Sequence, residues 1–363
     1  MGAQSVPAKR WCSQEKFSLE SGETLPGLEI AYETWGELSP EGDNVVVILH
    51  ALSGSSHAFA SAENPEPGWW EGLYTEGAPL RSGNYHIICA NIIGGCYGTT
   101  GPSSTNPGSG APYAAEFPQV TLRDMIEAQR LLLAALGIDK PVTLLGGSMG
   151  GMLILHWMCE HPEEVNRAIC LATPPRSEGF TIALRSVQRD AILRDPLYRQ
   201  GRYGEELPED GLSLARKIGM ITYRSPEEFN QRFGRDVRDA RSHFSEGLYE
   251  VQSYLDHQGK KFVARFDPNT YLYFSRAMDL FDISDGQDSL AAPFSSCQAK
   301  VLLLAINSDF LVPPAHMNEL QEAIAEAGVD VNLHVMDSIH GHDAFLIEAE
   351  QINTHIADFL QST

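Results

Sequence analysis

Short runs of Val, Ile, Leu and Ala recur along the first half of the chain, and they restrict its fold more than any other feature. We predict strands over residues 28–35, 44–52, 85–93, 142–147 and 167–172. These runs show little alternation of polar and apolar residues, which is typical of strands buried on both faces of a parallel sheet. The stretch 121–138 has helical apolar spacing, with Thr121 as a candidate N-cap and Gly137 near its end. We therefore expect an α/β fold with helices on both faces of a mostly parallel sheet.

The strand pattern is interrupted in the middle of the chain and then returns. Arginine-rich segments with helical spacing follow one another there, without a strand-like apolar run. Strand patterns at 300–307 and 331–336 then flank a helical pattern at 313–328. The predicted units are an α/β core, residues 1–175 and 297–363, and a helical lid inserted into it, residues 176–296.

One serine lies between glycines at a predicted strand-to-helix junction. Residues 146–150, Gly-Gly-Ser-Met-Gly, satisfy the G-x-S-x-G pattern in the context that this motif requires. Small flanking residues permit the sharp turn that exposes the Ser148 hydroxyl at the carboxyl end of the sheet. We interpret Ser148 as a nucleophile, against the alternative of a plain tight turn.

Acyl transfer by a serine also needs two donors for the developing oxyanion. The start of the helix after Ser148 offers the N–H of Met149. The loop "HALSGSSH" (50–57), which follows the second predicted strand, is placed to offer the other donor. We choose the N–H of Leu52 for this role, and the alternative for the loop is a plain Gly-Ser turn.

A nucleophilic serine needs a base, and the base needs an orienting carboxylate. In the α/β-hydrolase order the acid precedes the histidine. Asp309 stands just past a predicted strand, and His342 lies in a glycine-flanked loop after the last one. We choose these two residues. His340 remains an alternative base, and Asp337 and Asp343 remain alternative acids.

Charge and cysteine content restrict the partners and the compartment. A formal charge of −22 argues against binding to nucleic acid or to anionic membranes, and no run of 18 apolar residues occurs. The six cysteines are scattered, which indicates buried thiols in a reducing compartment rather than disulfides or a zinc site. The start "MGAQSVPAKRW" lacks the apolar segment of a signal peptide. We expect a cytoplasmic protein with no metal and no bound cofactor.

The positive charge is concentrated in one part of the chain. Of the 26 Lys and Arg residues, 13 lie between Arg176 and Arg241. One interpretation is a set of ion-paired helices, and the other is a place for an anionic ligand in an otherwise acidic protein.

Longer motifs resemble one enzyme family, the homoserine O-acetyltransferases, which are the acyltransferase branch of the α/β-hydrolases. They run from residue 50 to residue 346 and read "HALSGSSH", "PGWWEGL", "ANIIGGCYGTTGPSSTNP", "PYAAEFPQVT", "GGSMGG", "ARKIGMITYRS", "FDPNTYLY" and "GHDAFL". The resemblance implies that Ser148, Asp309 and His342 form the triad. It also implies a ping-pong reaction in which acyl-CoA is a co-substrate and an amino-acid hydroxyl accepts the acyl group.

The same resemblance implies how the amino acid is held. In this family an arginine of the "AR…TYRS" segment binds the substrate carboxylate, and the aspartate after the catalytic histidine binds the ammonium. The matching residues are Arg216, with Arg224 as the alternative, and Asp343. One cationic and one anionic side chain suit the carboxylate and the ammonium of a zwitterionic amino acid. Family members often form dimers through lid helices, so we expect a homodimer.

Two segments depart from the commonest family pattern. The loop reads "LSGSSH" where many members have Leu-Thr-Gly-Asp-Ala-His, and "IALRSVQRDAI" (182–192) places Arg185 where many have asparagine. The second segment looks more like the branch that acylates serine, including serine O-succinyltransferases. A guanidinium at Arg185 could bind the succinyl carboxylate through two hydrogen bonds. The alternative is a surface arginine paired with Asp190 or Glu178. One feature argues against a succinyl donor: succinyl-using homoserine enzymes tend to have Trp-Arg after the catalytic aspartate, and no arginine follows Asp309 here.

The first prediction for the activity is therefore L-serine O-succinyltransferase in cysteine biosynthesis. The alternative is transfer from acetyl-CoA to homoserine or serine, in methionine or cysteine biosynthesis. In either case the product carries a leaving group that sulfur can later replace. A plain esterase with the same triad is a remoter alternative. A non-catalytic binding protein is disfavoured, because all three triad candidates are present.

Overall fold

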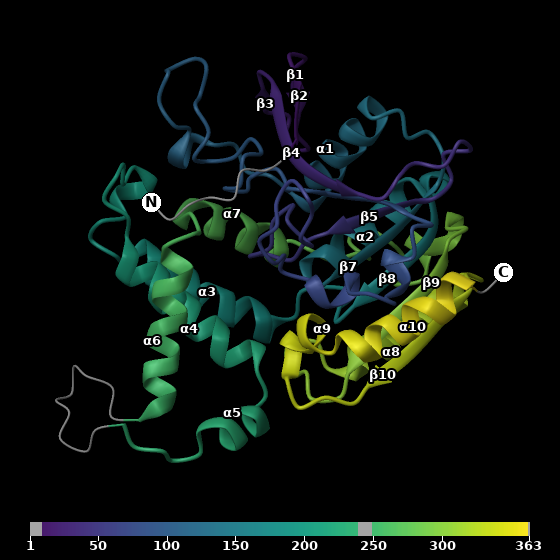
Figure 1. The fold of residues 1–363 in the computed structure, drawn as a ribbon. Helices are drawn as coiled ribbons and strands as arrows, with labels where there is room; N and C mark the ends of the chain where they lie inside the picture. Colours follow the sequence, from purple (N-terminus) through teal and green to yellow (C-terminus); the bar gives the residue numbers. More distant parts are fainter. Residues whose placement is uncertain (1–8, 239–248, 362–363) are drawn as a thin grey trace.

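The structure, a computed structural model, describes residues 9–238 and 249–361, and its centre is an eight-stranded mixed sheet (Figure 1). The strand order is β1-β4-β6-β5-β7-β8-β9-β10. Neighbouring strands from β6 to β10 are parallel, whereas β4 is antiparallel to both β1 and β6. The strand bounds are β1 Lys9–Ser13, β4 Leu28–Trp35, β5 Val45–Leu49, β6 His86–Ala90, β7 Val142–Gly147, β8 Val165–Leu171, β9 Lys300–Ile306 and β10 Val331–Met336. A separate antiparallel pair consists of β2 Phe17–Ser18 and β3 Thr24–Leu25.

The predicted strands are all present, and their bounds differ from the predictions by a few residues at most. Strand β1 has no counterpart among the predictions. Its sequence, Lys-Arg-Trp-Cys-Ser, has no apolar run, and it lies at the edge of the sheet with no fully buried residue. An edge strand needs one partner and little burial, so its pattern is weak.

Helices cover both faces of the sheet, as predicted. The α-helices are α1 Leu122–Ala135, α2 Met149–Glu160, α3 Gly179–Leu193, α4 Glu209–Tyr223, α5 Pro226–Phe233, α6 Glu250–Val263, α7 Pro268–Asp279, α8 Pro314–Glu326, α9 Ala344–Ile347 and α10 Ala349–Gln361. Short 3-10 helices are η1 Glu71–Tyr74, η2 Pro79–Arg81, η3 Ala114–Glu116, η4 Pro162–Glu164, η5 Arg199–Gly201, η6 Ala292–Ser296 and η7 Gly341–Asp343. The fold is therefore the α/β-hydrolase arrangement expected from the sequence.

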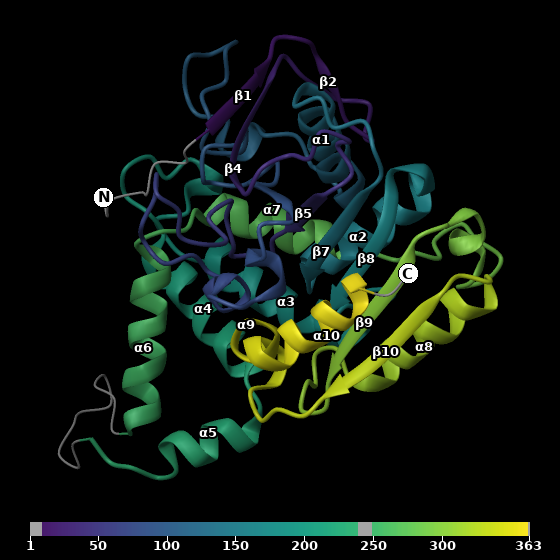
Figure 2. The same ribbon diagram turned by 45° about the vertical axis from the view of Figure 1, so that its right-hand side comes forward.

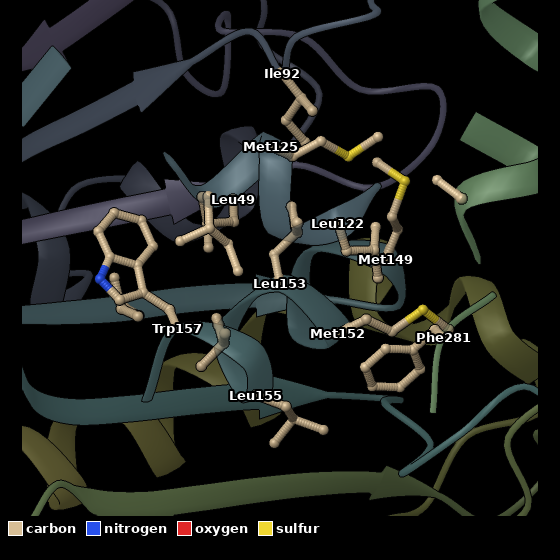
Figure 3. Packing of buried hydrophobic residues seen from close by; sticks show 14 of the residues in the cluster. Leu49, Ile92, Leu122, Met125, Met149, Met152, Leu153, Leu155, Trp157 and Phe281 are labelled. Carbon is tan, nitrogen blue, oxygen red and sulfur yellow. The ribbon is translucent and has the colours of Figure 1, made fainter. Parts of the chain in front are cut away.

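The two faces of β5 show how the core is divided. Val45, Val47 and Leu49 belong to the buried cluster that includes residues of α1, α2 and α8, whereas Val46 and Ile48 belong to the cluster that includes residues of α10 and η1. Alternate residues of a strand point to opposite faces, so an unbroken apolar run is buried on both sides. Figure 3 shows the first of these clusters, with α2 side chains packed around Leu49.

Helix α1 begins and ends at the residues that the sequence singled out. Thr121 is the N-cap, and it forms a capping box with Asp124. Gly137 has φ +74°, a left-handed conformation that favours glycine and stops the helix.

The α-helices α3 to α7 lie between β8 and β9 in the sequence, and α3 to α6 lie together beside the sheet (Figures 1 and 2). Within the described part of the predicted lid, the only β pairing is the isolated bridges Arg176–Asp282 and Val237–Tyr249. The boundaries at 176 and 296 stay predictions. No helix among the described residues is long and apolar enough to cross a membrane.

The arginine-rich segment is largely a set of ion-paired helices, the first of its two interpretations; Arg241 lies outside the described residues. The pairs include Arg176–Glu178, Arg176–Glu319, Arg185–Asp279, Arg189–Asp279, Arg194–Asp190, Arg199–Glu206, Arg202–Glu116, Lys217–Asp256, Arg224–Glu228 and Arg224–Asp343. Within the described ranges Arg216 forms no ion pair, and it is discussed below.

Candidate active site

Ser148 occupies a strained turn between β7 and α2. Its φ of 54° and ψ of −120° are rare for a residue with a side chain, and such conformations cluster at functional sites. The turn is held by a hydrogen bond from the Ser148 N–H to the carbonyl oxygen of Leu171, 2.9 Å. A Cβ atom at Gly150 would lie 2.0 Å from the carbonyl oxygen of Leu49. The last glycine of the motif therefore permits the end of β5 to approach the start of α2.

The structure brings Ser148, His342 and Asp309 together in hydrogen-bonding order. His342 Nε2 lies 2.9 Å from Ser148 Oγ, and His342 Nδ1 lies 2.6 Å from Asp309 Oδ2. The other oxygen of Asp309 accepts hydrogen bonds from the N–H groups of Leu311 and Val312, 2.8 and 3.0 Å. The carboxylate is thus fixed by the backbone, and it orients the imidazole toward the serine.

The alternative base and acids point elsewhere. His340 Nδ1 lies 3.3 Å from Glu228 Oε2, and Asp337 is exposed and accepts a hydrogen bond from Asn307, 2.5 Å. Asp343 forms an ion pair with Arg224. The geometry therefore favours His342 and Asp309 over these residues.

Burial and charge act in opposite directions on His342. Burial lowers the pKa of its imidazole, but the charge of Asp309, the hydrogen bond to it and the charge of Asp343 together outweigh burial. The net effect is a pKa above the ordinary value of histidine. The protonated imidazole that forms when the serine loses its proton is therefore stabilised.

Both predicted oxyanion donors are available. Met149 is the first residue of α2, and Leu52 lines the same pocket as Ser148. In the described part of the chain, neither N–H donates a hydrogen bond to a protein acceptor. Their role stays a prediction, and the orientation of Leu52 is taken up below.

The two residues expected to bind the amino acid line that pocket as well. Its volume is about 140 Å³, and Arg216 and Asp343 are in its wall with Ser148 and His342. The guanidinium of Arg216 stacks over Phe262, 4.9 Å from the ring centroid, and its Nε is buried without a hydrogen-bond partner. A half-buried guanidinium that lacks a partner on its buried Nε and lines the same pocket as the nucleophile is suited to bind a substrate carboxylate.

Arg224, the alternative to Arg216, is already engaged. It pairs with Glu228, and its Nε lies 3.2 Å from Asp343 Oδ2. The sequence analysis did not single out Glu228. Arg224 is the extended C-cap residue of α4, whereas Glu228 lies in the first turn of α5, so no helical spacing predicts this pair. The geometry thus favours Arg216 for the carboxylate.

Comparison with known proteins agrees with this geometry. The chain matches the family described as the alpha/beta hydrolase fold over residues 44–349. The homoserine O-acetyltransferase of Moorella thermoacetica is 45% identical over 94% of this chain and 93% of its own length. That of Methanohalophilus mahii is 44% identical over 98% of this chain and 72% of its own. The chain belongs to the homoserine O-acetyltransferase family of the α/β-hydrolase fold.

Two solved structures that superpose on this chain carry names of different activities. The homoserine O-acetyltransferase from Bacillus anthracis superposes with a TM-score of 0.91 at 27% identity, covering 98% of this chain and 97% of that one. The structure named esterase E22 gives a TM-score of 0.88 at 26% identity, covering 97% and 100%. The curated relatives carry an acyltransferase name, and the chain is accordingly an acyltransferase. They do not support the first prediction, L-serine O-succinyltransferase, and they favour its alternative.

Arg185 explains why that first prediction misled. Its Nε lies 2.6 Å from Asp279 Oδ1, and Arg189 binds the other oxygen of the same carboxylate, also at 2.6 Å. The Asp279 side chain is almost fully buried, and the two arginines share its carboxylate. Arg185 does line the pocket, but neither of the predicted partners, Asp190 and Glu178, contacts it. The guanidinium of Arg185 is already paired, which argues against its binding the carboxylate of a succinyl group.

Three side chains with metal-ligating atoms also come together outside this pocket. His161, Glu163 and Glu164 each offer a ligand atom, and these atoms lie within 4.8 Å of one another. Glu164 is occupied by Arg130, Nη2 to Oε1 2.5 Å, and by the indole N–H of Trp157, 3.0 Å. The ion pair and the hydrogen bond account for this cluster without a metal ion.

Proposed function

We propose that the protein transfers an acetyl group from acetyl-CoA to the side-chain hydroxyl of L-homoserine. The observation that carries the proposal is one pocket that combines Ser148 and His342 with an unpaired cation, Arg216, and an acid, Asp343. Such a pocket suits a zwitterion whose hydroxyl reacts at the serine. The names of the relatives favour acetyl over succinyl and homoserine over serine.

The first half-reaction would acetylate the enzyme. Ser148 Oγ attacks the thioester carbonyl carbon while His342 Nε2 accepts the hydroxyl proton. The oxyanion that forms accepts hydrogen bonds from the N–H groups of Leu52 and Met149. The C–S bond then breaks, His342 donates its proton to the departing sulfur, and CoA leaves as the free thiol.

The second half-reaction would pass the acetyl group to the amino acid. Arg216 binds the carboxylate of homoserine, and Asp343 binds its ammonium, so that the hydroxyl lies beside His342. His342 accepts the hydroxyl proton, the oxygen attacks the acetyl-serine carbonyl, and the proton returns to Ser148 Oγ as the ester bond breaks. Acyl-CoA enters as a co-substrate, and the reaction calls for no metal or bound cofactor.

Arg185 supports acetyl-CoA as the donor. A succinyl group ends in a carboxylate that needs a free cation, and Asp279 already neutralises Arg185. O-acetylhomoserine carries a leaving group that sulfur can replace, which suits methionine biosynthesis. The cytoplasmic location and the homodimer stay predictions.

A two-by-two assay tests the proposal. Acetyl-CoA or succinyl-CoA is combined with L-homoserine or L-serine, and free thiol and product mass are followed. We expect O-acetylhomoserine as the main product and no acyl-enzyme in Ser148→Ala. Main formation of O-succinylserine would overturn the proposal. A single equivalent of thiol per enzyme is expected without an amino acid, whereas continued thiol release over many turnovers would indicate the esterase alternative.

A further inference from the structure

His50 stands between the ends of two neighbouring strands, β5 and β6, and it is 2% exposed. Its Nδ1 lies 2.8 Å from the carbonyl oxygen of Ala51. On the other side of the ring, the N–H of Ile92 donates a hydrogen bond to Nε2, 3.1 Å. The ring therefore connects the peptide between Ala51 and Leu52, shortly after β5, with the backbone shortly after β6.

The partner on Nε2 determines which ring nitrogen carries the proton. Because Nε2 accepts the Ile92 N–H, it carries no hydrogen, so the neutral ring has its proton on Nδ1. Burial lowers the pKa of His50 to about 4, and the ring is neutral near pH 7. Nδ1–H thus donates to the carbonyl oxygen of Ala51.

That carbonyl belongs to the same peptide unit as the predicted oxyanion donor. The Ala51 C=O and the Leu52 N–H lie in one plane and point in opposite directions, because the peptide bond is trans. The Gly54 N–H also donates to the Ala51 oxygen, 2.9 Å. Two donors hold the oxygen, and they fix the direction of the Leu52 N–H, while Leu52 itself lines the pocket beside Ser148.

We infer that His50 is a positioning residue of the oxyanion site, which orients the Leu52 N–H by holding the carbonyl oxygen of Ala51. The inference rests on the proposed acyl-transfer chemistry, in which that N–H stabilises the tetrahedral intermediate. A structural role alone would be different: His50 would only satisfy the Ile92 N–H and fill the space between the strands.

Two amide variants separate these roles. In His50→Asn the amide nitrogen lies as many bonds from the backbone as Nδ1, so it can donate to the Ala51 oxygen but leaves the Ile92 N–H unpaired. In His50→Gln the amide oxygen corresponds to Nε2, so it can accept from Ile92 but leaves the Ala51 oxygen without its donor. His50→Asn therefore keeps only the hydrogen bond to the Ala51 oxygen, and His50→Gln keeps only the hydrogen bond from the Ile92 N–H.

The experiment measures serine acylation by p-nitrophenyl acetate and full turnover with acetyl-CoA and homoserine. Loss of an oriented oxyanion donor lowers kcat with little change in KM, and one such donor is worth about 100-fold or more. We expect this loss in His50→Gln and a kcat within about tenfold of wild type in His50→Asn. Melting temperatures of both variants report the structural contribution.

The opposite ranking, or an equal loss in both variants, would overturn the inference. If His50→Gln does not fold, His50→Asn decides, since the inference requires it to retain kcat despite the unpaired Ile92 N–H. Acylation by p-nitrophenyl acetate needs no amino-acid acceptor. A wild-type enzyme that is acylated but does not acetylate homoserine would therefore contradict the proposed function alone.

Discussion

Arg224 and Asp343 form an ion pair at the wall of the pocket, with 3.2 Å between Nε and Oδ2. Burial raises the pKa of the Asp343 carboxyl, and the charges of Arg224, Arg216 and His342 counteract this effect. Arg224 is also paired with Glu228. The net effect is a raised pKa of Asp343, to which the charge of Glu228 contributes. Glu228 therefore shares the charge of Arg224 with Asp343.

The first prediction concerns this carboxylate. Asp343→Asn should raise the KM for homoserine roughly 10- to 100-fold, because a hydrogen bond between charged groups is lost. Acetylation of Ser148 by acetyl-CoA should proceed at nearly the wild-type rate, since the donor does not need Asp343. Single-turnover acetylation and steady-state kinetics separate the two effects.

Asp337→Asn is the matched control for this prediction. Asp337 is exposed and hydrogen-bonded to Asn307, outside the pocket, so both kinetic constants should stay at wild-type values. An unchanged KM for homoserine in Asp343→Asn would remove the assigned role.

The second prediction concerns Arg185. Arg185→Asn leaves the buried Asp279 with Arg189 as its remaining ionic partner, so the free energy of unfolding should fall by about 1–3 kcal/mol. The ratio of kcat/KM for acetyl-CoA to that for succinyl-CoA should change less than tenfold, or about 1.4 kcal/mol. A larger shift toward acetyl-CoA would restore Arg185 as a contact of the acyl group.

Arg194→Asn is the matched control for Arg185→Asn, because Arg194 is the C-cap residue of the same helix, α3. Arg194 is largely exposed and pairs with Asp190 at 3.3 Å, so the free energy of unfolding should change by less than about 0.5 kcal/mol. Chemical denaturation of both variants measures the difference.

The contrast between Arg185 and Ser148 shows what the sequence could predict. Ser148 lies in a local motif between a buried strand and a helix, and that context is visible within about 20 residues. The partner of Arg185 is Asp279, 94 residues away, and no periodicity connects them. The segment 182–192, which suggested a succinyl donor, therefore carries an arginine that forms an ion pair within the predicted lid.

Strand direction was also hidden from the sequence. Six of the eight residues of strand β4 are buried, as in a strand covered on both faces, yet it runs antiparallel to β6. Burial on both faces makes a strand apolar whatever its direction. The importance of His50 was missed for a similar reason, since a histidine at the end of a strand has no pattern that reveals its partner Ile92.

The third prediction uses the close approach at the turn. Gly150→Ala would place a Cβ atom 2.0 Å from the Leu49 carbonyl oxygen and 2.9 Å from its carbon. Because backbone rather than a flexible side chain must move, the free energy of unfolding should fall by at least about 1–3 kcal/mol. Gly179→Ala is the control, since its Cβ meets nothing within 4 Å; there a gain of about 0.4–1 kcal/mol is expected. Equal stability of the two variants would contradict the close approach.

The fourth prediction concerns the pH dependence of activity. His342 must be neutral to accept a proton, so kcat/KM should rise with pH as the imidazole loses its own proton. Because the pKa of His342 is raised, the midpoint of this rise should lie above 6.5, the ordinary value. A profile with its midpoint at or below 6.5 would contradict the electrostatic account.

Variants of the two acids near His342 test the cause of that shift. The charge of Asp309 and its hydrogen bond raise the pKa more than the charge of Asp343 does. Asp309→Asn should therefore move the rise in kcat/KM to lower pH by more than Asp343→Asn does. It should also lower kcat by roughly 10⁴, because the asparagine favours the wrong tautomer of the histidine. An equal displacement in the two variants would mean that general charge around the pocket, rather than the 2.6 Å contact between Asp309 and His342, sets the proton affinity of the base.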